Sequence, residues 1–521
     1  MSKDRVYIYD STLRDGAQTR GVDFNVVDKQ DIAHELDKFG IDYIEGGWPG
    51  ANPTDDEFFE KQPKLKTSCL TAFGMTRKSG RSAKNDPTLA ALLDTGTKAI
   101  CIVGKSSSYQ TRTALNISKN ENLKMISESV GYLASKNREV LFDAEHFFDG
   151  YKADKKFTLA CAKAAYDAGA RWVVLCDTNG GTLPHEIEEI VTEVTKIIPG
   201  KNLGVHCHDD TGNAVANSLA AVRAGVRQVQ GTLNGLGERC GNANLVSIIP
   251  SLILKMGFKT GVKDLKQLTH LSRFLDEKLN RHPNIQAAFV GSAAFSHKGG
   301  LHVSAVAKAP ETYEHIKPES VGNSRTILVS DQAGKSNFVD RLNQLKIKFS
   351  DDKLGDFIRE IKEMEKEGYA FDGADASFEL LARKTFGKLP EFFNLSNYRV
   401  LVERRINAKK KLVTVSEATV KLTVKGKEVS TVGEGNGPIN ALDKALRAAL
   451  SSAYPKLNDT KLVDYKVRII SPALGTKAVT RVLIETEDKV GKRWSTIGVS
   501  ENVIDASYEA IAESIFYALM K

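Results

Sequence analysis

The segment VYIYDSTLRDGAQTRGVDF, residues 6–24, contains the structural unit from which the first half of the chain is built. A short apolar run passes directly into a turn that carries Asp10, Arg14 and Asp15, and an amphipathic stretch follows. This order predicts a buried β-strand, a polar loop and then a helix. An arginine and an aspartate side by side at the end of a strand are either solvated surface charges or two functional groups directed at one place.

The order of strand, loop and helix recurs eight times between residue 1 and about residue 257. The predicted strands are VYIYD (6–10), IDYIEGG (41–47), SCLTAFG (68–74), KAICIVG (98–104), EVLFDAE (139–145), WVVLCDT (172–178), LGVHCHDD (203–210) and RQVQGTLNG (227–235). Amphipathic helices are predicted between them, for example over 26–39, 183–198, 213–224 and 244–256. Glycines at 40, 96, 169, 225 and 257 are placed to end helices.

Eight such units in about 250 residues predict an α/β fold of the (β/α)8 TIM-barrel type. An open doubly wound sheet is the structural alternative. It would usually show fewer strands and a glycine-rich phosphate turn after the first strand, and this sequence has no such turn.

The barrel prediction implies that functional residues lie at the carboxyl ends of the strands, because those loops share one face. Polar residues do gather at these ends. They are Arg14 and Asp15 after the first strand, Glu45 on the second, Glu145 on the fifth, Asp177 and Thr178 on the sixth, His206 and His208 on the seventh, and GLGERCGN (235–242) after the eighth.

His206 and His208 are two residues apart on a strand, so their rings are expected to point to the same side. In HCHDD (206–210) they are followed by two aspartates. A histidine pair at this spacing is more often structural than a metal site, but barrel closure would bring Asp15 and Asn242 to the same place. One carboxylate, two imidazoles and an amide oxygen suit Mn²⁺, Mg²⁺, Zn²⁺ or Co²⁺, and donor types alone do not choose among them.

An open divalent site polarises a carbonyl group and binds a neighbouring carboxylate, which a 2-oxo acid offers together. Arg14 would then stabilise the oxyanion charge that grows in the transition state, while Asp15 holds the ion. Two adjacent residues would in this way direct two different groups into one cavity.

Four motifs in order resemble those of one enzyme family. TLRDGAQ (12–18), HCHDD (206–210), GLGERCGNANL (235–245) and FSHKGGLHVSAV (295–306) are similar to motifs of the 2-isopropylmalate, homocitrate and citramalate synthases. YIEGGWPGANPTDDEFF (43–59), TYEHIKPESVGNSRTILVS (312–330) and GYAFDGADASFELL (368–381) resemble most the bacterial citramalate synthase branch. The resemblance covers nearly the whole chain.

This resemblance implies a set of site residues. The implied metal ligands are Asp15, His206, His208 and Asn242, the implied catalytic residues are Arg14, Glu145, His302 and Tyr313, and the implied substrate-binding residues are Arg14, Thr178 and Glu145. The histidine that helps to deprotonate the acetyl group is His297 or His302, with His302 preferred. In the family it often arrives from the partner subunit.

The resemblance also implies an activity. The chain is expected to be a divalent-metal-dependent acyltransferase that condenses acetyl-CoA with pyruvate and water to give citramalate and CoA in isoleucine biosynthesis. The metal is expected to be Mn²⁺ or Mg²⁺, with Zn²⁺ or Co²⁺ as alternatives. The same reaction on another 2-oxo acid, as in 2-isopropylmalate synthase or homocitrate synthase, is the alternative function.

Composition agrees with a globular enzyme. Of 521 residues, 41% are hydrophobic and 26% are charged, and no apolar run is long enough to span a bilayer. The net charge of +8 forms no basic stripe of the kind that nucleic-acid binding needs. Six cysteines without C-x-x-C spacing predict reduced thiols. We therefore expect a cytoplasmic protein that binds neither nucleic acid nor membrane.

Three domains are predicted: a TIM-barrel catalytic domain (1–275), a helical linker subdomain that contributes to the active site (276–400), and an α+β regulatory domain (401–521). The last one contains an internal repeat, because residues 426–446 and 491–511 align without a gap at an offset of 65. Each copy reads as strands followed by a helix. Such a unit is expected to form a homodimer, and the resemblance implies isoleucine as an allosteric inhibitor. The small residues of GEGNGP (433–438) are expected to leave room for this ligand.

Two other functional classes remain. A non-catalytic amino-acid sensor would be expected to have lost Arg14, Asp15, His206 or His208, and all four are present. A lyase that cleaves rather than condenses shares the barrel, but the C-terminal repeat favours biosynthesis under feedback control.

Overall fold

The computed structural model describes residues 4–279, 281–327, 335–387, 389–406, 408, 410–470, 475 and 478–521. The chain divides into two compact units, one of residues 1–295 with 316–325 and the other of residues 296–315 with 326–521. Within the described residues, no helix has the length and apolar character needed to cross a membrane.

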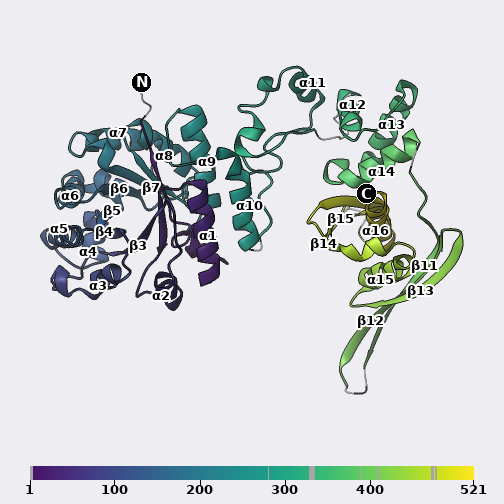
Figure 1. The fold of residues 1–521 in the computed structure, drawn as a ribbon, viewed down its shortest axis with the longest axis horizontal. Helices are drawn as coiled ribbons and strands as arrows, with labels where there is room; N and C mark the ends of the chain where they lie inside the picture. The colour runs from purple at the N-terminus through teal and green to yellow at the C-terminus, as the bar shows by residue number, and fades with distance from the viewer. Residues whose placement is uncertain are drawn as a thin grey trace. The chain divides into compact units, whose positions relative to one another are not determined.

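The first unit is a closed barrel of eight parallel strands, as predicted (Figure 1). The strands are β1 (Tyr7–Asp10), β2 (Tyr43–Gly47), β3 (Cys69–Met75), β4 (Ala99–Lys105), β5 (Glu139–Glu145), β6 (Trp172–Asp177), β7 (Leu203–Cys207) and β8 (Gln228–Gly231). Each matches a segment that the sequence predicts. The ring closes where β1 pairs with β8, with Tyr9 opposite Gln230.

Helices surround the barrel (Figure 1). They are α1 (Val26–Phe39), α2 (Pro53–Glu60), α3 (Pro87–Asp94), α4 (Ser108–Thr113), α5 (Lys119–Ser135), α6 (Phe147–Asp167), α7 (Pro184–Thr195), α8 (Ala214–Arg223), α9 (Leu245–Pro250) and α10 (Leu268–Lys278). The predicted helix 244–256 is not uniform, because α9 continues as a π-helical turn over Ser251–Lys255.

Helix α1 shows how local sequence sets these boundaries. Asn25 and Asp28 form a reciprocal capping box at its start, which satisfies free backbone N–H groups. It ends at Gly40, which has a φ of 104° and no room for a side chain, because a Cβ there would lie 2.3 Å from the Gly261 carbonyl oxygen. Glycine is required at this helix end because other residues rarely adopt this φ and because there is no space for a Cβ.

The barrel has an inner and an outer core. Aromatic and small side chains such as Tyr9, Trp172 and Cys101 fill its interior, while the outer faces of the strands pack against the helices. The catalytic end of such a barrel is free to carry polar groups because the packed layers below it supply the stability.

Among its described residues, the second unit begins with two very short strands and four α-helices. These are β9 (Ser296–His297), α11 (Gly300–Lys308), β10 (Thr326–Ile327), α12 (Lys335–Gln344), α13 (Asp351–Glu367) and α14 (Asp375–Phe386). Residues 328–330, the end of one motif that resembles the citramalate synthase branch, lie outside the described residues.

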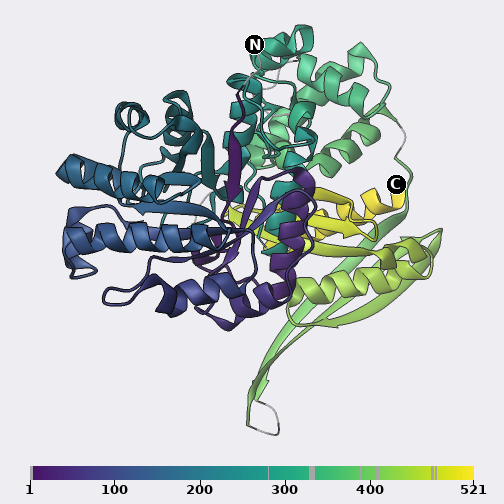
Figure 2. The same cartoon turned by 60° about the vertical axis from the view of Figure 1, so that its left-hand side comes forward.

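The predicted C-terminal repeat is present as two copies of a three-stranded antiparallel sheet and a helix. The first copy consists of β11 (Phe393–Ile406), β12 (Leu412–Val424), β13 (Lys427–Gly435) and α15 (Pro438–Ser451), and the second of β14 (Thr460–Ile469), β15 (Thr480–Asp488), β16 (Arg493–Ser500) and α16 (Val503–Met520). Strands β11 and β12 extend as a two-stranded ribbon beyond the part of β12 that pairs with β13 (Figure 2).

Candidate active site

The loop after β1 is held in place by Asp10. Both carboxylate oxygens of Asp10 accept hydrogen bonds from Thr12, one from its N–H and one from its hydroxyl, each at 2.9 Å. The hydroxyl oxygen of Thr12 in turn accepts the N–H of Leu233 at 2.9 Å. Through these hydrogen bonds Asp10 braces the turn that carries Arg14 and Asp15. Burial raises the pKa of Asp10 to about 7.

Asp15, His206 and His208 converge at the carboxyl ends of β1 and β7. The Asp15 Oδ2 atom lies 3.3 Å from His206 Nε2, which lies 3.3 Å from His208 Nε2. One candidate ligand atom from each residue lies within 4.8 Å of the others, and all three residues are buried. The barrel thus brings together the three ligands that the sequence predicts.

Asn242 joins this group from the loop after β8. Its Nδ2 atom lies 2.9 Å from Asp15 Oδ2 and 3.3 Å from His206 Nε2. Its Oδ1 atom is buried without a hydrogen-bond partner among the described residues. A Cβ at Gly237 would lie 2.0 Å from this Oδ1 atom, so glycine at 237 leaves the space that the amide occupies.

The charges of these donors fit a divalent cation. Burial would raise the pKa of Asp15, but Arg14, together with the neighbouring His206, outweighs it and holds this pKa well below its usual range. Burial and the adjacent His206 lower the pKa of His208 to about 4, so its imidazole is neutral at pH 7. An ionised carboxylate beside an imidazole lone pair is a mixed O/N set of the kind that binds first-row divalent metals.

The two aspartates of HCHDD do not belong to the donor group. Asp209 accepts the N–H of Ala214 at 2.8 Å, at the start of α8. Asp210 forms an ion pair with Arg239 at 2.7 Å.

Arg14 is oriented by contacts on three sides. Its Nε–H donates to Glu45 Oε2 at 2.8 Å, its Nη1 lies 3.5 Å from Asp15 Oδ2, and its guanidinium lies over the Phe73 ring at 3.8 Å. Burial would lower the pKa of Arg14, but Glu45 and Asp15 raise it well above its usual range. Tyr9 donates its hydroxyl to the other Glu45 oxygen at 2.7 Å. The guanidinium is therefore charged and fixed beside the candidate metal ligands.

Glu145 and Thr178 line the same cavity as the candidate metal ligands. Glu145 pairs with Lys105, a β4 residue without a role in the sequence prediction, at 2.5 Å. The Thr178 hydroxyl oxygen accepts the backbone N–H of His146 at 2.8 Å, so its own proton stays available to a ligand. His146 has a φ of 56°, a left-handed conformation that is uncommon for a residue other than glycine.

The cavity has a volume of about 300 Å³. One side is polar, with the metal ligands, Arg14 and Glu145. The apolar part of the lining consists of Trp48, Phe73, Met75, Val103 and Cys176.

His302 and Tyr313 belong to the second unit, where they stack on each other with ring centroids 4.2 Å apart. Both are exposed. The other candidate base, His297, is buried in β9 and pairs with Glu314 at 3.2 Å. The catalytic roles of His302 and Tyr313 stay predictions.

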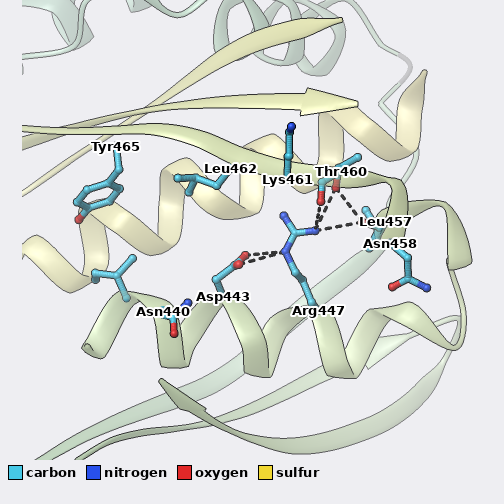
Figure 3. Close-up of a pocket in the computed structure, with 10 residues that line it drawn as sticks. Asn440, Asp443, Arg447, Leu457, Asn458, Thr460, Lys461, Leu462 and Tyr465 are labelled. Atoms are coloured by element: carbon cyan, nitrogen blue, oxygen red, sulfur yellow. Dashed lines mark hydrogen bonds and ion pairs between the residues drawn. The ribbon is translucent and has the colours of Figure 1, made fainter. Parts of the chain in front are cut away.

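A second cavity, of about 640 Å³, lies in the C-terminal repeat (Figure 3). Asp443 and Arg447 of α15 form an ion pair at 3.0 Å on its floor, and Arg447 Nη1 also donates to the carbonyl oxygens of Leu457 and Thr460. Apolar side chains including Leu462 and Tyr465 complete the wall. The cavity therefore offers both charge signs and an apolar surface.

Two glycines of GEGNGP, Gly433 and Gly435, lie close against α15. A Cβ at Gly433 would lie 2.6 Å from the Ala441 carbonyl oxygen, and one at Gly435 would lie 2.5 Å from the Ala441 nitrogen. Gly498 has the same relation to Ala506 in the second copy. These glycines permit close packing of β13 and β16 on their helices, and none of the GEGNGP residues lines the cavity.

Comparisons with known proteins match nearly the whole chain. The HMGL-like family matches residues 5–275, a homocitrate synthase post-HMGL domain-like family matches 289–369, and the LeuA allosteric (dimerisation) domain matches 372–519. The (R)-citramalate synthase of Aquifex aeolicus is 52% identical over 99% of this chain and 98% of its own length. That of Geobacter sulfurreducens is 50% identical, with the same coverage. The chain belongs to the citramalate synthase family.

Members of the citramalate synthase family are acyltransferases, and this chain is therefore an enzyme of that class. A probable 2-isopropylmalate synthase of Methanopyrus kandleri is also similar, but at 33% identity over 98% of each chain. The family named from the sequence motifs is thus confirmed, together with the barrel fold.

In this member of the citramalate synthase family, sequence reasoning missed several residues of the site. Lys105 is the last residue of β4, at the carboxyl ends of the strands, where functional residues were expected. Its position could therefore have identified it as a site residue. Glu45 was placed near the cavity without a defined role. Asp143 and Gln230 stand in apolar strand segments close to the metal ligands, and a polar residue pointing inward from a buried strand is the signal that could have found them.

Proposed function

We propose that the protein is a metal-dependent citramalate synthase that condenses acetyl-CoA with pyruvate and water to give citramalate and CoA in isoleucine biosynthesis. The observation that carries the proposal is the convergence of Asp15, His206 and His208 beside the fixed guanidinium of Arg14. Five (R)-citramalate synthases at 42–52% identity, against 30–33% for 2-isopropylmalate synthases, support pyruvate as the acceptor.

Asp15, His206 and His208 would hold the ion, with Asn242 as a fourth ligand through its oxygen. A divalent ion bound there supplies polarisation of the acceptor carbonyl. Mn²⁺ or Mg²⁺ is proposed, and Zn²⁺ or Co²⁺ also suit these donor types.

The residues of the chain divide the remaining work. Arg14 stabilises the negative charge that develops on the acceptor oxygen as the new carbon–carbon bond forms. The Thr178 hydroxyl donates a hydrogen bond to the carboxylate of the acceptor. The methyl group of the thioester is a very weak acid, so its deprotonation needs a placed base. We assign this task to His302 with Tyr313, while Glu145 is the carboxylate near the bound oxo acid. Hydrolysis of the thioester by water then makes the reaction run one way.

The acceptor assay tests this function. Purified protein with acetyl-CoA and Mn²⁺ is given pyruvate, 3-methyl-2-oxobutanoate or 2-oxoglutarate, and release of the free CoA thiol is followed. We expect pyruvate to give the highest kcat/KM. A higher value with either of the other acids would replace this function by that of a 2-isopropylmalate or homocitrate synthase.

We further propose that isoleucine inhibits the enzyme by binding in the cavity at α15. The Asp443 carboxylate suits the ammonium group, Arg447 or Lys461 suits the carboxylate, and Leu462 with Tyr465 suits the apolar side chain. The match of residues 372–519 to the LeuA allosteric (dimerisation) domain supports both this regulation and a homodimer.

The proposed functional division of the chain is a catalytic barrel (1–275), a helical linker that contributes to the active site (276–400) and a regulatory, dimerising domain (401–521). A cytoplasmic location is proposed with it.

A further inference from the structure

Three buried polar side chains, those of Asp143, Gln230 and His206, form a hydrogen-bonded row in the barrel interior. The proposed reaction gives no role to the Asp143 and Gln230 part of this row. Gln230 of β8 and His206 of β7 are register partners in adjacent strands, and both are buried. The Gln230 Oε1 atom lies 2.9 Å from His206 Nδ1. At its other end, Gln230 Nε2 donates to Asp143 Oδ1 of β5 at 3.0 Å. Asp143 and Gln230 therefore connect the barrel interior to one ring nitrogen of a metal ligand.

The hydrogen bonds of this row of side chains have a defined direction. The Gln230 amide directs its NH₂ group to Asp143, which accepts the hydrogen bond, and its oxygen to His206. An amide oxygen only accepts, so the His206 Nδ1 atom must carry a proton.

This proton decides what the opposite ring nitrogen can do. A neutral imidazole with a proton on Nδ1 has its lone pair on Nε2. The His206 Nε2 atom is the one that faces Asp15 Oδ2 and His208 Nε2, each at 3.3 Å. The opposite tautomer would place a hydrogen where the cation is expected.

We propose that Gln230, oriented by Asp143, is a positioning residue that fixes His206 in the Nδ1–H tautomer and so prepares Nε2 to bind a divalent cation. This inference rests on the metal site of the proposed function. Gln230 and Asp143 would then contribute to the metal affinity although neither binds the ion. Hydrogen-bond partners of metal-ligating histidines generally have this effect.

The chain provides a matched control two residues earlier on the same strand. Gln228 is fully buried and points to the same side of β8 as Gln230. Neither of its amide atoms has a hydrogen-bond partner among the described residues. Gln228→Leu therefore makes the same change of shape and polarity in the barrel interior without touching His206.

The test is Mn²⁺ binding to the metal-stripped full-length protein, measured by isothermal titration calorimetry, with the thermal unfolding of each apo variant recorded in parallel. Gln230→Leu is expected to bind Mn²⁺ about 10- to 100-fold more weakly than the wild type. Gln228→Leu is expected to bind with unchanged affinity. Wild-type affinity in Gln230→Leu, or an equal loss in Gln228→Leu, would overturn the inference.

If Gln230→Leu does not fold, a second pair of variants, which exchanges the amide of Gln230 and the carboxylate of Asp143, tests the same proposal. Gln230→Glu alone places two carboxylates side by side and is expected to weaken Mn²⁺ binding. The double variant Gln230→Glu/Asp143→Asn restores one carboxylate and one amide, with the introduced carboxylate accepting from His206, and is expected to regain most of the affinity. A double variant no better than Gln230→Glu would contradict the assignment. If the wild type itself binds no Mn²⁺, the metal site of the proposed function is overturned instead.

Discussion

The Nε–H of Arg14 donates to the carboxylate of Glu45 at 2.8 Å, although the two residues are 31 positions apart in the sequence. Glu45 is fully buried near the end of β2 and also accepts the Tyr9 hydroxyl. Burial raises the pKa of Glu45, and Arg14 opposes this rise. The contact uses the Nε atom of the guanidinium, while its Nη1 atom lies 3.5 Å from Asp15 Oδ2.

Replacing Glu45 by Gln should therefore reduce activity without removing the metal. The neutral amide loses the charge that orients Arg14, and a hydrogen bond to a charged group is worth about 1.5–3 kcal/mol, or roughly a 10- to 100-fold fall in kcat/KM. Steady-state kinetics and Mn²⁺ titration on the same preparation measure both effects. An unchanged kcat/KM would show that Arg14 does not need Glu45.

Arg14→Ala should lower kcat by about 10²- to 10³-fold, by analogy with loss of an oxyanion-stabilising donor. Its affinity for Mn²⁺ should stay close to that of the wild type, because Arg14 is not a ligand. Arg14→Lys retains the charge without the Nε contact to Glu45, and its kcat should lie between those of the wild type and Arg14→Ala. Wild-type turnover in Arg14→Ala would remove Arg14 from the mechanism.

Asp15→Ala should lose metal affinity and activity together, since the one carboxylate of the donor set is removed. Asp210→Asn is the matched control, because its carboxylate follows the two histidines in HCHDD but pairs with Arg239. Calorimetric titration with Mn²⁺ should show weak or no binding only for Asp15→Ala. Equal losses in the two variants would indicate a general effect of negative charge around the cavity.

Glu513 should make the stability of the second unit depend on pH. Burial raises its pKa from 4.5 to about 8, with Glu509 adding to the rise, and its carboxyl group is hydrogen-bonded to Ser377. Between these two pH values the unfolded chain releases the proton while the folded chain keeps it, so the free energy of unfolding falls as pH rises. Glu513→Gln should remove this loss and stabilise the protein by about 1–3 kcal/mol at pH 8.5, with no gain at pH 4.5.

Denaturant unfolding of Glu513→Gln at the two pH values checks this expectation. Glu501→Gln, an exposed residue just before α16, is the control and should shift stability at neither pH. A gain that is equal at pH 4.5 and pH 8.5 would mean that the substitution acts through packing and not through ionisation.

Inhibition by isoleucine should depend on Asp443. Asp443→Asn removes the carboxylate proposed to bind the ammonium group and weakens the pair with Arg447. The concentration of isoleucine needed for half inhibition should rise at least about tenfold, while the uninhibited kcat stays the same. Lys444→Ala, at the next and exposed position of α15, should retain normal inhibition. Unaltered inhibition in Asp443→Asn would exclude this cavity.

The barrel was predictable because its signals are local. Each strand is an apolar run, each helix has a regular polar face, and glycines such as Gly40 and Gly225 end the helices in left-handed conformations. Strand ends on a common face then follow from the fold, which is why the sequence alone is enough to group Asp15, His206 and His208.

The partners of these residues could not be predicted in the same way. Gln230 contacts His206, and Asp143 contacts Gln230, only after the ring closes and the register of β7 and β8 is fixed. The packing of Gly433 on α15 could not be predicted for a related reason. A glycine that makes room for a neighbouring helix and one that makes room for a ligand look alike in sequence, and only the position of Ala441 distinguishes them.

The most direct test of the central claim is an anomalous difference map at the manganese edge, from a crystal of the protein soaked with Mn²⁺ and pyruvate. We expect one strong peak at coordination distance from Asp15 Oδ2, His206 Nε2 and His208 Nε2, with density for pyruvate between the peak and Arg14. A peak bound by other residues, or none at this position, would contradict the account.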